Sequence, residues 1–316
     1  MATQETRKLD EIIASRRAVM LGGSALAALA LTGIAKAQTT TGPTDADILN
    51  FALNLEYLEG QFYTLATSGQ TIDQLGVGTG AGTSATGGGT VTVKPTGVAS
   101  CKVPFVSTNV AAYANETAVE ERKHVSFLRG ALGSAAVAQP NLDLYNSFIA
   151  LGTAVGVPAF DPFASDLFFL LGAYIFEDVG VTAYHGAAGL ISSKANLAPA
   201  VGIHAVEAYH AGLVRTVLYG MDQANPALGI AALTQKISKV RNTADGSTTT
   251  DDVGLSQTMV ALNGTSPTFT SSTVVNADAN SIGFARTTTQ VLAIVTVGAA
   301  GNKGGFFPAG LNGNIK

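Results

Sequence analysis

The chain has 316 residues, with 18 lysines and arginines against 22 aspartates and glutamates, a net charge of −4 at pH 7. Because no basic excess is present, the charge argues against a nucleic-acid partner. Charged residues make up 13% of the chain and hydrophobic residues 47%, which predicts a large core, one main domain with long appendages, and a homo-oligomer. Cys101 is the single cysteine, so an internal disulfide framework is excluded, and we interpret Cys101 as a structural loop residue.

The first 37 residues have the organisation of an export signal. Arg16 and Arg17 precede an apolar stretch over residues 18–34, and an A-x-A cleavage motif ends at Ala37. The adjacent arginines indicate a twin-arginine signal, so we expect cleavage after Ala37 and a periplasmic or extracellular protein. An ordinary secretory signal or an N-terminal anchor is the alternative.

Periodic apolar patterns with capping signals predict four long helices and a shorter one. Thr44 suits the N-cap of the first helix, and Gly133 suits the end of the second. The pair Asp161-Pro162 suits the start of the third helix, and Pro199 suits the first position of the fourth. The predicted helices cover residues 44–67, 107–132, 161–191, 199–219 and 225–241.

The segments between and after these helices differ in composition. Residues 69–104 are rich in Gly and Thr, which predicts a surface insertion with a short hairpin. Residues 243–316 form a C-terminal extension, in which Thr287 and Gln290 make a capping box for a further helix; we expect the apolar tail as a loop across the bundle. The predicted fold class is all-α, a four-helix bundle over residues 38–242 with an insertion and an extension.

The third helical segment resembles a membrane span in length and apolar content. Glu177 and Asp178 lie at its centre, where a bilayer would make both carboxylates costly. We therefore expect no membrane span once the N-terminal signal has been removed.

Two of the four histidines follow a glutamate by three residues, on two different amphipathic helices. At this spacing both side chains of each pair point to the apolar face of their helix. The first and third helices each place a glutamate on the apolar face without a histidine. The pattern along the chain is Glu, Glu-x-x-His, Glu, Glu-x-x-His, formed by Glu56, Glu121, His124, Glu177, Glu207 and His210.

A buried carboxylate without a partner is strongly unfavourable, so this pattern predicts bound cations. Four carboxylates and two neutral imidazoles balance the charge of two divalent ions, and oxygen and imidazole ligands suit iron or manganese. The same order of ligands is described for di-iron and di-manganese carboxylate bundles. By analogy with those sites, Glu121 and Glu207 would bridge the metals, Glu56 and Glu177 would be terminal ligands, and the two histidines would complete the set.

Residues around the predicted ligands repeat between the two halves of the chain. Tyr63 and Tyr184 each follow a terminal glutamate by seven residues, and we interpret them first as core aromatics and second as residues that support the ligands or relay electrons. Gly60 and Gly180 each lie one turn after the same glutamates. The first two helices therefore resemble a degenerate copy of the other two.

Other polar residues lie close to the ligands in the sequence. We interpret Glu59, Glu120 and Asp178 as solvated flanks that at most accept a hydrogen bond from a ligand. His185 and His204 are interpreted as ordinary helix histidines.

The segments NFALNLEYLEGQFY and EERKHVSFL, together with the helix that carries Glu207 and His210, resemble the ferritin-like domain of the exported, desiccation-related protein family. The C-terminal segments ADANSIGFARTTTQVLAIV and GGFFPAGLNG also resemble that family, so the similarity covers most of residues 44–316. The resemblance implies a ferritin-like four-helix bundle linked to stress or desiccation tolerance. It does not imply a defined reaction.

Three functions agree with these features. The first, which we favour, is oxidation of Fe(II) or reduction of O₂ or peroxide at a centre of two iron ions. The second is manganese-catalase-like activity with two manganese ions, and the third is a non-enzymatic stress protein whose metals only hold the bundle together. Iron storage in a hollow cage is disfavoured, because the insertion and the long tail do not fit a short, regular subunit.

Overall fold

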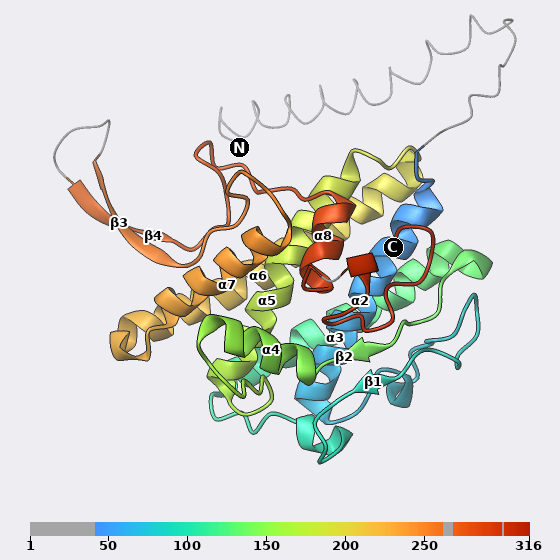
Figure 1. The fold of residues 1–316 in the computed structure, drawn as a ribbon, viewed down its shortest axis with the longest axis horizontal. Helices are drawn as coiled ribbons and strands as arrows, with labels where there is room; N and C mark the ends of the chain where they lie inside the picture. Colours follow the sequence, from blue (N-terminus) through green and yellow to red (C-terminus); the bar gives the residue numbers. More distant parts are fainter. Residues whose placement is uncertain (1–41, 262–267, 299) are drawn as a thin grey trace, which may run out of the picture. The chain divides into compact units, whose positions relative to one another are not determined.

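The computed structural model describes residues 42–261, 268–298 and 300–316. The export signal predicted over residues 1–37 lies outside these residues. The described part contains four long helices, α2 (Asp45–Ser68), α3 (Thr108–Leu132), α5 (Asp166–Ala188) and α6 (Lys194–Ala224) (Figure 1). The shorter helices are α4 (Asn146–Val155), α7 (Ile230–Ala244) and α8 (Thr288–Val295). The predicted all-α bundle with extensions is confirmed.

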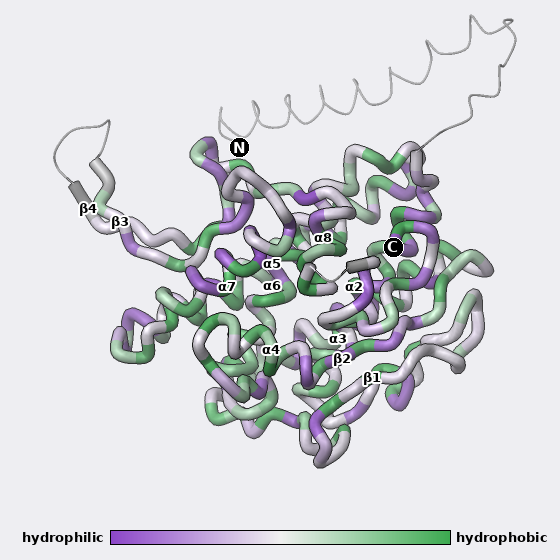
Figure 2. The backbone as a smooth tube through the Cα atoms, in the orientation of Figure 1, coloured by the Kyte–Doolittle hydropathy of each residue, from purple (hydrophilic) through white to green (hydrophobic). Residues whose placement is uncertain are grey.

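The helices α2 and α5 form the centre of the bundle. Every residue of α2 from Ile48 to Ala66 is buried, and α5 is buried almost all round because apolar side chains cover its circumference. The helices α3 and α6 each bury one face, α3 chiefly against α2 and α6 chiefly against α5. Figure 2 shows hydrophobic stretches throughout the helical part and hydrophilic ones on outer helices such as α7 as well as in the loops.

By length and composition, α5 is the one helix among the described residues that could cross a membrane. In this structure, however, 83% of its most apolar window is buried inside the protein. Such burial is typical of a core helix in a bundle.

Local capping signals explain where three helices begin. The Thr44 side chain accepts from the N–H of Asp47, and the Asp47 carboxylate accepts from the N–H of Thr44, which completes a capping box for α2. Ser107 caps α3 with one hydrogen bond, because its side chain accepts from the N–H of Val110. The predicted capping box at Thr287 is also present and starts α8.

The predicted start of the third long helix at Asp161 is wrong. Asp161 accepts the N–H of Phe163 within a turn and pairs with Lys94 at 3.0 Å. The helix α5 begins after Ser165, whose hydroxyl accepts the N–H of Phe168. A hydrogen bond within a turn and a long-range ion pair have therefore replaced the expected cap.

The predicted start of the fourth long helix at Pro199 is also wrong. The helix α6 begins at Lys194, so Pro199 lies inside it and leaves one backbone hydrogen bond unmade. The carboxylate of Asp45, from the first turn of α2, accepts the N–H groups of Ser192 and Ser193 and thereby holds this end. This anchor comes from another helix, which explains why the local pattern missed it.

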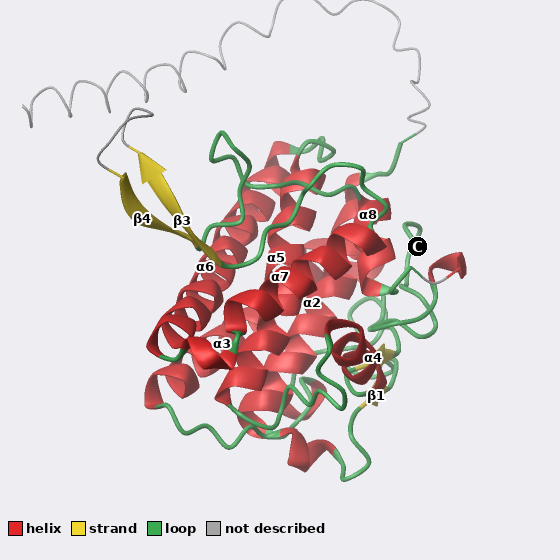
Figure 3. Ribbon diagram, turned by 60° about the vertical axis from the view of Figure 1, so that its left-hand side comes forward, coloured by secondary structure: helices red, strands yellow, loops and turns green. Residues whose placement is uncertain are grey.

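The predicted hairpin in the Gly/Thr-rich insertion is wrong for the described residues. The strand β1 (Val91–Thr92) pairs in parallel with β2 (Leu142–Asp143), which follows α3 in the chain. An antiparallel hairpin is found instead in the C-terminal extension, between β3 (Ser256–Ala261) and β4 (Thr268–Thr273). Figure 3 shows this hairpin extending away from the helices.

The C-terminal tail packs on the bundle. The N–H of Asn312 donates to Asn54 Oδ1 in α2, and Asn54 Nδ2 donates to the carbonyl of Asn312, both at 2.9 Å. Phe306 and Phe307 are buried. The tail thus lies along the central helix, as a loop with apolar anchors.

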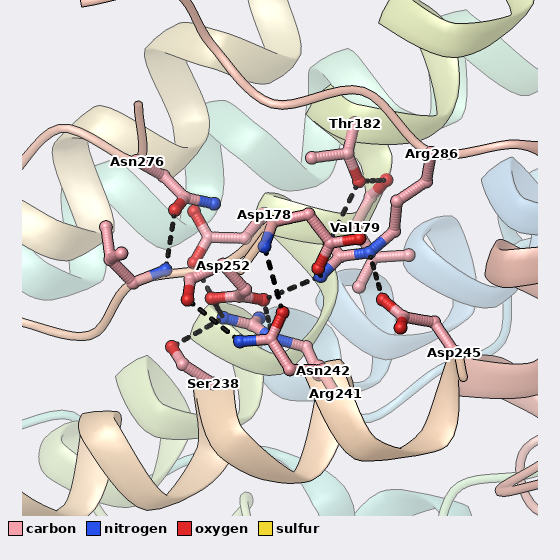
Figure 4. Close-up of polar contacts among 12 residues, drawn as sticks. Asp178, Val179, Thr182, Ser238, Arg241, Asn242, Asp245, Asp252, Asn276 and Arg286 are labelled. Carbon is pink, nitrogen blue, oxygen red and sulfur yellow. Dashed lines mark hydrogen bonds and ion pairs between the residues drawn. The ribbon is translucent and has the colours of Figure 1, made fainter. Parts of the chain in front are cut away.

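A buried network of charges also joins the extension to the bundle (Figure 4). Arg241 of α7 donates to Asp178 of α5 and to Asp252, both at 2.9 Å. Arg215 of α6 donates to the same Asp178 at 2.8 Å. Arg286, just before α8, contacts Asp252 and two further aspartates. Paired charges of this kind link three helices to the extension.

Candidate metal centre

The four long helices bring all six predicted ligands together at the centre of the bundle. Each of these side chains is at least nine-tenths buried, although each carries a charge or a polar ring. Two groups offer ligand atoms that lie within 4.8 Å of one another. The first consists of Glu56, Glu121, His124 and Glu207, and the second of Glu121, Glu177 and His210.

The imidazole nitrogens face carboxylate oxygens at short range. His124 Nδ1 lies 3.2 Å from Glu56 Oε2 and 3.4 Å from Glu207 Oε1. His210 Nδ1 lies 3.0 Å from Glu121 Oε1. None of these facing atoms has a hydrogen bond of acceptable geometry, and an unpaired buried polar atom costs about 1–3 kcal/mol. Buried carboxylate oxygens and imidazole nitrogens that converge without forming hydrogen bonds fit bound cations.

Electrostatics points the same way. Burial raises the pKa of Glu56 to about 8, although His124 opposes the shift. Burial disfavours the imidazolium of His210, but Glu177 and Glu121 outweigh it and raise the pKa of His210 to about 11. Without metal, the centre therefore holds protons on both carboxyl and imidazole groups. Divalent cations would displace these protons.

Glu121 differs from the other carboxylates of the centre. Burial alone would raise its pKa, but contacts with His124 and His210 outweigh this and lower it to about 2. Glu121 also belongs to both groups of ligand atoms, as a bridging ligand must. Glu207, expected by analogy as the second bridge, contributes to the first group alone.

The two tyrosines donate across the bundle to two of the candidate ligands. The Tyr63 hydroxyl of α2 donates to Glu177 of α5, and the Tyr184 hydroxyl of α5 donates to Glu56 of α2. Burial raises the pKa of both phenols well above the usual range, so both remain protonated donors. The sequence placed each tyrosine beside the glutamate of its own helix, whereas the structure pairs it with the opposite one.

Of the three residues interpreted as solvated flanks, Glu120 is half-buried and contacts the candidate ligand His210. Its Oε2 lies 2.8 Å from His210 Nε2. Carboxylates in this position orient ligating imidazoles and select their tautomer. The expected role, an acceptor for a ligand, agrees with this contact.

The interpretation is wrong for Glu59 and Asp178, which are 5% and 2% exposed. Asp178 accepts from the buried arginines described above. Glu59 lies near Glu207: a Cβ atom at Gly180 would lie 3.4 Å from Glu59 Oε1 and 2.5 Å from Glu207 Oε2. The apolar character of α2 and α5 on every side is the signal that could have shown that neither helix has a solvated face.

The remaining histidines and the cysteine lie outside the two ligand groups. His185 Nδ1 is 3.0 Å from the carbonyl oxygen of Phe284, and its ring packs near that of His204. Cys101 is buried at the end of a 3₁₀ turn over Val98–Cys101, and burial raises the pKa of its thiol.

Comparisons with known proteins agree with this fold. A family model described as the ferritin-like domain matches residues 44–220. The chain is 32% identical over 265 residues to the desiccation-related protein PCC13-62 of Craterostigma plantagineum. This alignment covers 81% of the chain and 79% of the relative. It is 27% identical over 279 residues to the ferritin-like catalase Nec2 of Nesocodon mauritianus, with coverage of 86% and 84%. No solved structure matches the chain. The chain therefore belongs to the ferritin-like, desiccation-related protein family.

Proposed function

We propose that this protein binds two transition-metal ions, with iron as the first choice, and oxidises Fe(II) or reduces O₂ or peroxide in stress protection. The observation that carries the proposal is the set of facing carboxylate and imidazole atoms that lack hydrogen-bond partners in the centre of the bundle. Oxygen and imidazole donors suit iron and manganese. Such ions, when bound, supply Lewis-acid and one-electron chemistry toward small oxygen compounds.

A small apolar cavity lies beside Glu59 and Gly180, two residues close to the candidate ligand Glu207. A cavity of about 20 Å³ lies between α2, α5 and α8, lined by apolar side chains together with Glu59 and Gly180. This volume holds about one water-sized molecule. Phe306 of the tail also lines the cavity, so the C-terminal extension helps to keep bulk water out.

Peroxide disproportionation is the second candidate. It is favoured by the similarity to Nec2, which is named a ferritin-like catalase. In this reaction two molecules of H₂O₂ give two of water and one of O₂, so no external reductant is needed. The same ligand set serves manganese.

Metal analysis combined with two assays tests these proposals. We expect about two iron or manganese ions per chain in the native protein, with Fe(II) oxidation or peroxide consumption at that stoichiometry. Glu121→Ala should abolish both the binding of two metal ions per chain and turnover, while the circular dichroism spectrum stays unchanged. A protein that takes up no transition metal would contradict the proposal, and a lower melting temperature without any redox loss would favour a purely structural metal site.

We also propose that the protein acts after export and assembles as a homo-oligomer. The twin-arginine pattern at Arg16 and Arg17 and the low share of charged residues support these two points. Replacing both arginines with lysine should leave uncleaved precursor inside the cell. Light scattering on the mature protein measures the oligomeric state, and a monomer would contradict the second point.

A further inference from the structure

The two metal positions are not equivalent in their protein ligands. Four side chains converge on the first position, whereas Glu121, Glu177 and His210 converge on the second. A site with three protein ligands keeps a coordination position open, as catalytic metal sites do. The second position is therefore the more open of the two.

A groove of about 650 Å³ runs between α3 and α6 beside the second position. Of the six ligand residues, His210 lines this groove. Glu116 and Glu120 lie one helical turn apart along its α3 side. Among the described residues that line it, no lysine or arginine is found. Two carboxylates without a counter-charge attract cations.

Glu120 connects the groove to the metal position. A cation on Nδ1 of His210 leaves the ring proton on Nε2, from which it donates to Glu120 Oε2 at 2.8 Å. This hydrogen bond holds the ring so that Nδ1 faces Glu121 at 3.0 Å. No corresponding hydrogen bond to the other ring nitrogen of His124 is found among the described residues, so the support is specific to the second position.

We propose that the groove between α3 and α6 is the route by which a hydrated divalent cation enters the second position, and that Glu120 is the positioning residue that holds His210 for it. The inference rests on the proposed metal centre. It adds that the two cations bind in sequence, with the second exchangeable through the groove and dependent on Glu120.

Titration of the metal-free protein with Co(II) tests the role of Glu120, because the visible absorption of Co(II) reports its coordination. We expect two classes of site in the natural protein. Glu120→Ala should weaken the second class by about 10–100-fold, the usual effect of removing such a partner, and leave the first unchanged. Glu116→Ala removes the same charge from the groove but not the hydrogen bond, so it should leave both affinities unchanged. Equal affinities in the Glu120→Ala protein and the natural protein would overturn this role.

The rate of Co(II) uptake tests the route. Gly212 lines the groove, and a Cβ atom there meets nothing within 4 Å, so Gly212→Phe should fill the groove without straining the helix. We expect the second Co(II) to bind at least tenfold more slowly, with the final stoichiometry unchanged. Gly202→Phe is the matched control, since Gly202 also lies on α6 with open space around it but does not line the groove.

The two proposals fail in different ways. If no variant and no natural protein binds Co(II), the metal centre itself is refuted. If two ions bind but Gly212→Phe loads as fast as Gly202→Phe, the centre stands and the route is refuted. Circular dichroism of each variant confirms that the fold is intact before the titrations are compared.

Discussion

Gly180 lies where α5 passes the carboxylate of Glu207 on α6. A Cβ atom at this position would lie 2.5 Å from Glu207 Oε2, which is closer than a Cβ atom comes to a non-bonded atom. The carboxylate is the end of a flexible side chain, so it would move while the backbone stays in place. Gly180 therefore makes room for a predicted metal ligand.

Gly180→Ala should consequently lower metal affinity by about tenfold or more without unfolding the protein. The matched control is Gly60→Ala, because a Cβ atom at Gly60 meets its nearest neighbour, Val125, at 3.5 Å. Alanine in a helix is favoured over glycine by about 0.5–1 kcal/mol, so the control should melt slightly higher and keep its metals. Equal metal content in both variants would contradict the role of Gly180.

Tyr63 offers a second test at the scale of one residue. Tyr63→Phe removes the hydrogen bond to Glu177 and leaves that buried carboxylate oxygen without a donor, so we expect a lower melting temperature, since an unpaired buried acceptor costs about 1–3 kcal/mol. Because Glu177 loses its support, metal affinity or turnover should fall by about 10–100-fold. Equilibrium metal binding and peroxide turnover, measured in parallel on the variant and the natural protein, test whether Tyr63 supports Glu177. Unchanged values would make Tyr63 a core aromatic only.

The six candidate ligands could be predicted because each is a charged or polar residue on a stripe that is otherwise apolar. Glu59 and Asp178 could not be assigned in this way. On helices that are apolar all round, the stripe pattern no longer separates an inner face from an outer one. Their burial depends on the C-terminal extension, which packs over α2 and α5. It also depends on arginines of α6 and α7 that contact both α5 and the extension.

At the scale of the elements, Asp45 joins the beginnings of α2 and α6. Its carboxylate accepts from the N–H groups of Ser192 and Ser193 and from Asn196. These hydrogen bonds, led by that from Ser192, lower the pKa of Asp45 to about 2. In the folded protein the carboxylate of Asp45 therefore stays ionised at lower pH than in the unfolded chain. The stability that its hydrogen bonds contribute is fully present above about pH 4 and is lost as the pH falls toward 2.

Asp45→Asn should therefore lower the melting temperature by about 2 °C near pH 6, a modest effect because the site is close to solvent. The difference from the natural protein should shrink steadily below pH 4 as the natural carboxylate takes up its proton. Calorimetry at pH 6 and at pH 3 measures both values. A difference that is the same at both pH values would contradict the role of the charge.

The ends of the elements show where sequence patterns stop being informative. Thr44, Ser107 and Thr287 were predictable as caps because each bonds to its own helix. The true start of α6 depends on Asp45, which is far away in the sequence, and the pairing of β1 with β2 joins segments on either side of α3. Contacts of this kind are fixed by the folded arrangement and leave no periodic signal nearby.

At the scale of the whole molecule, Arg286 fixes the C-terminal extension to the bundle (Figure 4). Its guanidinium contacts Asp245 at 3.0 Å, Asp251 at 3.0 Å and Asp252 at 3.2 Å. Its backbone N–H donates to the carbonyl of Thr182 in α5. The close passage over α5 is possible because Gly186 has no Cβ, which would lie 1.9 Å from the carbonyl oxygen of Arg286.

Arg286→Met should lower the free energy of unfolding by about 3–5 kcal/mol, the usual cost of removing one partner from a buried ion pair. It leaves carboxylates buried without their cation. Burial already raises the pKa of Asp251 to about 6 against the opposing charge of Arg286, so the variant should be relatively more stable near pH 5, where this carboxyl can hold a proton. Urea unfolding at pH 5 and pH 8 measures the difference.

Limited proteolysis shows whether the stability lost in Arg286→Met is lost in the C-terminal extension alone. If Arg286 is what holds the extension, cleavage between residues 245 and 286 should speed up while α2 and α3 stay resistant. Arg122→Met is the control, because half-buried Arg122 makes one hydrogen bond, to Thr64 at 3.0 Å, and should cost about 1 kcal/mol. If Arg286→Met costs no more than Arg122→Met, the extension is held by its apolar anchors at Phe306 and Phe307, and the charge network serves the bundle alone.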